Sequence, residues 1–262
     1  MTGSAITADY VDVRNIRIWL ARGGDDGPPL LYLPGTDPDG EDPSLPLLSR
    51  DFRVYRPHHP GFGRSDDDPA VDSVLDLAFR YLDLLDALRL DRVRLMGVSL
   101  GGWIAAQVAV LAPDRITRLV LADPAGLRPP VPVPDMFTLD PVELAMLIHH
   151  EPQVRQAAVT SVCEMPADAE RFTRYLRNRA ATAHLGWNPY MHDPKLAGRL
   201  HRIGCDVLLI WGASDRLLPP ECALAWQQAL PGTRLELIEN AGHRPQAEQP
   251  AAFAALVRKF LA

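Results

Sequence analysis

Hydrophobic and polar positions alternate between two patterns along most of this chain. Short runs rich in leucine and β-branched residues predict strands, and longer stretches with apolar residues three and four positions apart predict helices. The predicted strands are 16–22, 29–33, 52–56, 92–97, 118–122, 206–211 and 234–238, and the predicted helices are 71–89, 100–112, 221–229 and 249–261. Apolar strands separated by helices are typical of a mostly parallel sheet that is covered on both faces. The pattern therefore predicts an α/β fold with a doubly wound sheet.

This alternation is interrupted once, between residues 124 and 200. The interruption begins with DPAGLRPPVPVPDMFTLDP, which cannot form a regular helix or a central strand, because proline fixes φ and lacks the N–H donor. Several stretches of helical character follow, and none of them has a strand pattern. We predict a core domain formed by residues 1–123 and 201–262, with an inserted helical cap at 124–200.

Composition and charge exclude several classes of protein. With 262 residues, 47% of them hydrophobic and 23% charged, the chain has the make-up of a soluble globular protein. A net charge of −6 without a Lys/Arg block argues against a nucleic-acid partner. No basic segment precedes an apolar one at the N-terminus, and no apolar run approaches the roughly 18 residues of a membrane span. We expect a cytoplasmic protein without a membrane partner, either a monomer or a homodimer.

The cysteines do not suggest a metal site or a disulfide framework. Cys163, Cys205 and Cys222 lack ligand spacing, and an odd number cannot all pair within one chain. Free thiols are the expectation in a reducing compartment. We predict no metal and no cofactor.

The sequence GVSLGG, residues 97–102, places a serine where a predicted strand ends and a predicted helix begins. Such a sharp turn exposes the hydroxyl of Ser99, and the turn closes only if its flanking residues, Gly97 and Gly101, are small. The free N–H groups of the helix beginning near Leu100 would stabilise an oxyanion. The alternative is a strand–helix turn without chemistry.

A serine nucleophile needs a base, and the base needs an acid that orients it. Asp215, in DVLLIWGASDRLLPP, and His243, in RLELIENAGHRPQAEQP, each follow a predicted strand. Both loops open at the carboxyl ends of their strands, on the side where Ser99 is expected. Asp123 follows another strand and is a rival acid, or else bonds the start of the cap. The other histidines, including His59, are interpreted as surface, pocket-wall or structural residues.

The chain resembles the α/β-hydrolase fold family over nearly its whole length. The resemblance rests on PLLYLPGT, HHPGFGRSDD, GVSLGG, LIWGASDRLLPP and NAGHRPQAEQP in their expected order. It implies a Ser99–Asp215–His243 triad, an oxyanion hole made by the backbone N–H groups of Thr36 and Leu100, and a cap that selects the substrate. Asp37 follows Thr36, and we expect its carboxylate to point away from the hole or to accept a backbone N–H.

Two residues bear on the reaction. Carbon–carbon hydrolases of this fold usually have Asn before the nucleophile and Trp after the histidine, where this chain has Val98 and Arg244. We therefore predict a serine hydrolase that cleaves a small carboxylic ester through an acyl-enzyme on Ser99. The first alternative is a carbon–carbon hydrolase or lyase acting on a small acidic diketone, with a charged cap helix around Arg174 and Arg177 gripping the acid. The second is a ligand-binding receptor with residual hydrolase activity.

Several large side chains are candidates for lining a substrate pocket. They are Trp103, Phe137, Trp187, Tyr190 and Leu217. Core packing is the alternative for each of them. The identity of the small-molecule substrate depends on the shape of the cavity, so motifs leave it open.

Overall fold

An eight-stranded sheet forms the centre of the molecule in the computed structural model, which describes residues 5–262. Residues 1–4 of the predicted core segment lie outside the described residues. The strand order is β1-β2-β4-β3-β5-β6-β7-β8; β1 pairs with β2 and β2 with β4 in antiparallel fashion, and the other pairs are parallel. The strands are β1 Thr7–Val13, β2 Ile16–Gly23, β3 Pro29–Leu33, β4 Arg53–Pro57, β5 Val93–Val98, β6 Ile116–Ala122, β7 Asp206–Gly212 and β8 Arg234–Ile238. This confirms the predicted α/β fold with a mostly parallel sheet.

Strand β1 was not predicted. Its sequence, TADYVDV, is exposed along most of its length, and Val13 is its one buried residue. A strand that buries so little surface lacks the hydrophobic pattern by which the other strands were recognised. It forms because its backbone pairs with β2 across a tight turn.

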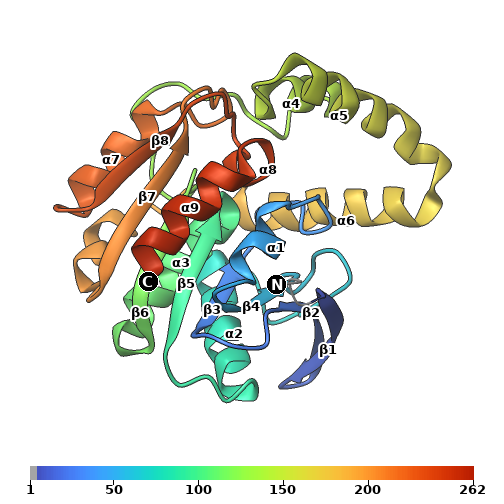
Figure 1. The fold of residues 1–262 in the computed structure, drawn as a ribbon. Helices are drawn as coiled ribbons and strands as arrows, with labels where there is room; N and C mark the ends of the chain where they lie inside the picture. The colour runs from blue at the N-terminus through green and yellow to red at the C-terminus, as the bar shows by residue number, and fades with distance from the viewer. Residues whose placement is uncertain (1–4) are drawn as a thin grey trace.

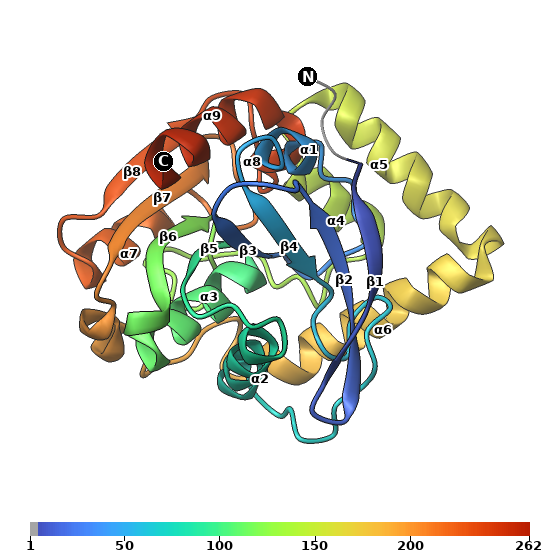
Figure 2. The ribbon, with the colours of Figure 1, turned by 60° about the horizontal axis from the view of Figure 1, so that its bottom comes forward.

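Helices cover both faces of the sheet (Figures 1 and 2). Helices α2, α3 and α7 share one buried cluster with alternate strand residues such as Leu31, and α1 and α9 share the other with residues such as Leu30. Both faces of β3 are therefore apolar, as is typical of a central parallel strand. The helices are α1 Ser44–Leu48, α2 Val74–Ala87, α3 Leu100–Leu111, α7 Glu221–Ala229, α8 Pro245–Glu248 and α9 Pro250–Leu261, with 3-10 turns at Pro113–Arg115, Met165–Ala167 and Ala197–Arg202.

Three further helices lie between β6 and β7, within the segment where the strand pattern is interrupted. They are α4 Pro141–Ile148, α5 Pro152–Glu164 and α6 Ala169–Gly186. In Figure 1, α5 and α6 form an arm that extends beyond the sheet. Of the helices within residues 5–262, none combines the length and the apolar character that crossing a membrane requires.

Candidate active site

Ser99 occupies a strained turn between β5 and α3. Its backbone has φ 53 and ψ −118, a conformation that costs a non-glycine residue on the order of 1–3 kcal/mol. The turn is held on both sides, because Ser99 N donates to Ala122 O at 2.9 Å and Ser99 O accepts from Ala125 N at 3.2 Å. These bonds fix Ser99 at the carboxyl end of the sheet.

The residues around Ser99 must be glycine because neighbouring backbone segments pass too close for a side chain. A Cβ on Gly97 would lie 2.1 Å from the carbonyl oxygen of Gly101, and a Cβ on Gly101 would lie 2.2 Å from that of Leu33. Atoms cannot approach so closely without a backbone shift. The glycines in GVSLGG thus let β5, α3 and the end of β3 meet.

His243 connects Ser99 to Asp215. Its Nε2 lies 2.9 Å from Ser99 Oγ, and its Nδ1 lies 2.6 Å from Asp215 Oδ2. The other carboxylate oxygen, Asp215 Oδ1, accepts hydrogen bonds from the amides of Leu217 and Leu218, each at 2.9 Å. Asp215 and His243 are 3% and 5% exposed, so water competes little for these contacts.

Asp123 lies beside the Ser99–His243–Asp215 contacts, but it makes no hydrogen bond to His243. Its Oδ1 accepts from Gly212 N of β7 at 2.9 Å, and its buried Oδ2 has no partner among the described residues. Burial, followed by the nearby charge of Asp215, raises the pKa of the Asp123 carboxyl well above its usual range. The structure thus brings Asp215, rather than Asp123, against His243.

Asp123, Asp215 and His243 also form the one group of potential metal ligands found within residues 5–262. Their nearest ligand atoms lie within 4.8 Å of one another. Both ring nitrogens of His243 already take part in hydrogen bonds to Asp215 and Ser99. The cluster is arranged as a hydrogen-bonded network.

The two predicted oxyanion donors come from two separate segments that both lie near Ser99. Leu100 is the first residue of α3, and Thr36 follows β3 by three positions. The loop carrying Thr36 passes close to the serine, since a Cβ on Gly35 would lie 3.4 Å from Ser99 Cβ. Among residues 5–262, no protein group accepts a hydrogen bond from either amide. Both donors are thus available to another acceptor.

Asp37 is exposed, and its carboxylate lies near Gly40, as does the guanidinium of Arg244. A Cβ on Gly40 would lie 2.8 Å from Asp37 Oδ2 and 2.7 Å from Arg244 Nη2.

The candidate pocket residues differ in their exposure and fall into two groups. Trp103 and Leu217 are buried, with 4% and 7% exposed. Phe137, Trp187 and Tyr190 form an aromatic cluster, in which the Phe137 ring centroid lies 5.4 Å from that of Trp187 and 5.8 Å from that of Tyr190. Trp187 is 60% exposed, so it lies on the surface rather than in an enclosed cavity.

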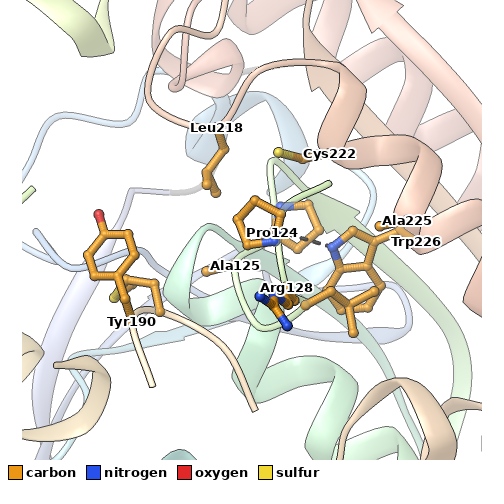
Figure 3. Close-up of a pocket in the computed structure, with 11 residues that line it drawn as sticks. Pro124, Ala125, Arg128, Tyr190, Leu218, Cys222, Ala225 and Trp226 are labelled. Carbon is orange, nitrogen blue, oxygen red and sulfur yellow. Dashed lines mark hydrogen bonds between the residues drawn. The ribbon is translucent and has the colours of Figure 1, made fainter. Parts of the chain in front are cut away.

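A small cavity lies beside Pro124 and Ala125, the two residues that follow Asp123 (Figure 3). Pro124, Tyr190, Leu218 and Trp226 are among its lining residues, and the indole of Trp226 donates to Pro124 O at 3.3 Å. Its volume of about 10 Å³ has room for about one water molecule. The cavity is too small for an organic substrate.

The charged residues of α6 bind other parts of the protein. Arg177 donates to Ser65 O at 2.7 Å and pairs with Asp67 at 2.6 Å, while Asn178 Oδ1 accepts from Gly63 N at 2.7 Å. The three other arginines are also engaged: Arg171 donates to Ser161, Arg174 pairs with Asp39 and Glu170, and Arg179 donates to the carbonyls of Met136 and Leu139. The arginines therefore join α6 to its neighbours.

Sequence reasoning did not single out His59, which is fully buried behind the loop of Thr36. Its Nε2 lies 2.9 Å from the carbonyl oxygen of Pro34, and its Nδ1 contacts the hydroxyl of Tyr81 on α2. The motif HHPGFG marks a turn, but it carries no signal for a contact between residues 25 positions apart.

Comparisons with known proteins agree with this architecture. Residues 18–256 match the family model described as "Alpha/beta hydrolase family". A 2-hydroxy-6-oxononadienedioate/2-hydroxy-6-oxononatrienedioate hydrolase from Pseudomonas putida is 29% identical over 231 residues, which are 82% of this chain and 79% of the relative.

Two solved structures show the same fold. A 2-hydroxy-6-oxo-6-phenylhexa-2,4-dienoate hydrolase from Rhodococcus has a TM-score of 0.80 at 22% identity, with 98% of this chain and 99% of that chain covered. A bacterial membrane phospholipase A has a TM-score of 0.75 at 24% identity, with 98% and 86% covered. Proteins with quite different substrates thus share this architecture.

Proposed function

Because this chain belongs to the α/β hydrolase family, we propose that it is a serine hydrolase that cleaves small carboxylic esters through an acyl-enzyme on Ser99. The observation that carries the proposal is the unbroken contact from Ser99 Oγ through His243 to Asp215. It supplies a nucleophile, a base and an acid that orients the base.

The geometry supports ester hydrolysis in which His243 accepts and returns each proton. His243 Nδ1–H donates to Asp215, which leaves the Nε2 lone pair facing the Ser99 hydroxyl. Nε2 takes the hydroxyl proton as Oγ attacks the ester carbonyl carbon, and the amides of Thr36 and Leu100 hold the oxyanion. His243 then gives the proton to the leaving alcohol. A water molecule, deprotonated by His243, attacks the acyl carbon; the bond to Ser99 Oγ then breaks, His243 returns the proton to Oγ, and the acid is released.

The helical segment 124–200 is proposed to act as the cap that selects the substrate. Its helix α6 is fastened to the loop at Gly63 and Ser65, which is supported by the bonds from Asn178 and Arg177. A cap attached in this way would limit the size of the ester that reaches Ser99.

Carbon–carbon bond hydrolysis is the second candidate, and the names of the relatives favour it. The Pseudomonas putida relative is named for hydrolysing dienedioates, which are dianions. An enzyme for such substrates needs cationic groups that are free to pair with carboxylates. Arg174 and Arg177 of α6 are already paired with carboxylates of this protein, which supports the neutral ester instead.

The proposal is tested by assaying Ser99→Ala against p-nitrophenyl esters of increasing acyl length. Removal of the nucleophile is expected to lower kcat by about 10⁴-fold or more. A fluorophosphonate probe should label Ser99 in the unmodified protein. Ser161→Ala, on α5, removes a hydroxyl outside the triad and is the control. Full activity of Ser99→Ala, or labelling of another residue, would contradict the mechanism.

The two candidate reactions are distinguished by their substrates. Turnover of short esters together with no cleavage of a vinylogous diketone acid supports the esterase. The reverse result supports carbon–carbon hydrolysis by the same triad. Ligand-dependent thermal stabilisation without turnover of either would indicate a binding protein instead.

A further inference from the structure

The loop that carries the proposed oxyanion donor Thr36 is anchored on both sides of Gly35. Downstream, Arg56 of β4 donates to Pro38 O at 2.9 Å. Upstream, His59, two residues beyond β4, holds Pro34 O at 2.9 Å. Glycine has the greatest backbone freedom of any residue, so Gly35 alone would leave the direction of the next amide poorly defined.

The contact at Pro34 determines which ring nitrogen of His59 carries the proton. A carbonyl oxygen can only accept, so Nε2 must donate to Pro34 O. Nδ1 is then the acceptor, and the hydroxyl of Tyr81 donates to it. Burial lowers the pKa of His59 to about 4 and raises that of Tyr81 well above its usual range, so both groups stay neutral at physiological pH.

The Pro34 carbonyl is also confined from its other side. A Cβ on Gly101 would lie 2.3 Å from Pro34 O, so this oxygen rests against the first turn of α3. A hydrogen bond on one side and a close backbone contact on the other leave the peptide little freedom to rotate. Both His59 and Tyr81 are fully buried, so water cannot replace either partner.

We infer that His59, oriented by Tyr81, is a positioning residue that aims the Thr36 amide at the oxyanion by holding the carbonyl of Pro34. The inference rests on the proposed serine hydrolase mechanism. His59 touches neither Ser99 nor the reacting atoms. Its contribution is greatest in the transition state, where negative charge develops on the carbonyl oxygen, and small in the substrate complex.

Two substitutions at His59 separate hydrogen bonding from packing. In His59→Gln the side-chain amide nitrogen can occupy the position of Nε2 and still donate to Pro34. In His59→Asn the side chain is too short to reach Pro34, and its amide nitrogen falls near the position of Nδ1. Tyr81→Phe removes only the hydroxyl that orients the ring. Phe253→Leu, in the buried part of α9, is a control for general loss of core packing.

Three readouts are measured for each variant: kcat and KM for a p-nitrophenyl ester, the rate of Ser99 labelling by a fluorophosphonate, and the affinity for phenylboronic acid, which forms a tetrahedral adduct. His59→Asn is expected to lower kcat, labelling rate and boronate affinity by about 10- to 100-fold with KM nearly unchanged. Tyr81→Phe should lower the same three quantities by about 3- to 10-fold, and His59→Gln should keep each of them within about 3-fold of the unmodified protein. Phe253→Leu should lower the melting temperature and leave the boronate affinity unchanged.

The inference is overturned if His59→Asn equals the unmodified protein in all three readouts, or if His59→Gln loses as much as His59→Asn. If His59→Asn fails to fold, Tyr81→Phe and His59→Gln still provide the comparison. Failure of the proposed function is a different result: the unmodified protein then neither hydrolyses the esters nor is labelled at Ser99.

Discussion

Two buried carboxyl groups, Asp123 and Asp215, lie close to His243. Their hydrogen bonds differ, and this difference indicates which of them is stabilised as a carboxylate. Asp215 accepts two amide hydrogen bonds and contacts His243, which are interactions that stabilise a carboxylate. Asp123 accepts one, from Gly212, and its second oxygen has no partner among the described residues. Burial and the nearby charge of Asp215 raise the pKa of the Asp123 carboxyl well above its usual range, which favours its protonated form.

Asp123→Asn is therefore expected to preserve activity, with kcat changed by less than about 3-fold, because the amide resembles the protonated carboxyl. Asp215→Asn is the matched control and should lower kcat by about 10⁴-fold. A loss of more than tenfold in Asp123→Asn would show that the ionised form of Asp123 is needed.

The same substitution should change how stability depends on pH. The pKa of Asp123 in the folded protein lies above the unfolded value of about 3.9. The contribution of Asp123 to the free energy of unfolding is therefore fully present below about pH 3.9 and is lost as the pH rises. The loss amounts to at most about 1.4 kcal/mol per pH unit. Asparagine does not ionise, so Asp123→Asn avoids this loss. Urea unfolding should show that the free energy of unfolding of Asp123→Asn, relative to that of the unmodified protein, is higher at pH 8 than at pH 5.

At the scale of elements, helix α6 is joined to the core by polar contacts. Its N-terminal cap is Asp168, whose side chain accepts from Arg171 N, and its middle carries the residues that bind the loop at Gly63. The sequence offered a grip on an acidic substrate as one role for the charges of α6, because a run of charges does not identify its partners. The loop between β4 and α2 supplies the partners of Arg177 and Asn178.

Asn178→Ala should loosen the attachment of α6. The Gly63 amide loses its acceptor within a buried contact, which is expected to lower the free energy of unfolding by about 1–3 kcal/mol. Hydrogen exchange should accelerate at residues 61–67 and in α6 more than in the sheet. Leu176→Ala, on the same helix and 49% exposed, should change stability by less than about 0.5 kcal/mol. Equal exchange in both variants would contradict an attachment through Asn178.

For the molecule as a whole, several buried histidines connect folding to pH. Burial lowers the pKa of His58 to about 3 and that of His59 to about 4, against an unfolded value of about 6.5. Folding keeps both rings neutral, so their contribution to stability is present above about pH 6.5 and is lost as the pH falls. The protein should therefore lose stability on mild acidification, before its carboxylates are protonated.

Each of these two histidines should make the free energy of unfolding fall by up to about 1.4 kcal/mol per pH unit between pH 6.5 and 5. Urea unfolding at several pH values measures this slope, and His58→Gln should reduce it by about that amount. His201→Gln, at an exposed position, is the control and should leave the slope unchanged. If His58→Gln and the unmodified protein had the same slope, burial of His58 would not control acid unfolding.

The sequence by itself determined the succession of elements and the relatives of this chain. Seven of the eight strands and helices α2, α3, α7 and α9 could be predicted, because period and propensity act over a few residues; the short helix α1 was not predicted. Strand β1 could not, since it buries almost nothing. The turn at Ser99 was also readable, because its glycines reflect a local backbone requirement.

Only the tertiary structure decided which side chains meet. It brought Asp215 rather than Asp123 to His243, paired Arg174 and Arg177 of α6 with carboxylates of the core, left Trp187 on the surface, and buried His59 behind Pro34. Ser99 and His243 are 144 positions apart, and no local pattern encodes a contact over that distance. Such contacts depend on how the whole sheet and its helices pack, so they appear only when the chain is folded.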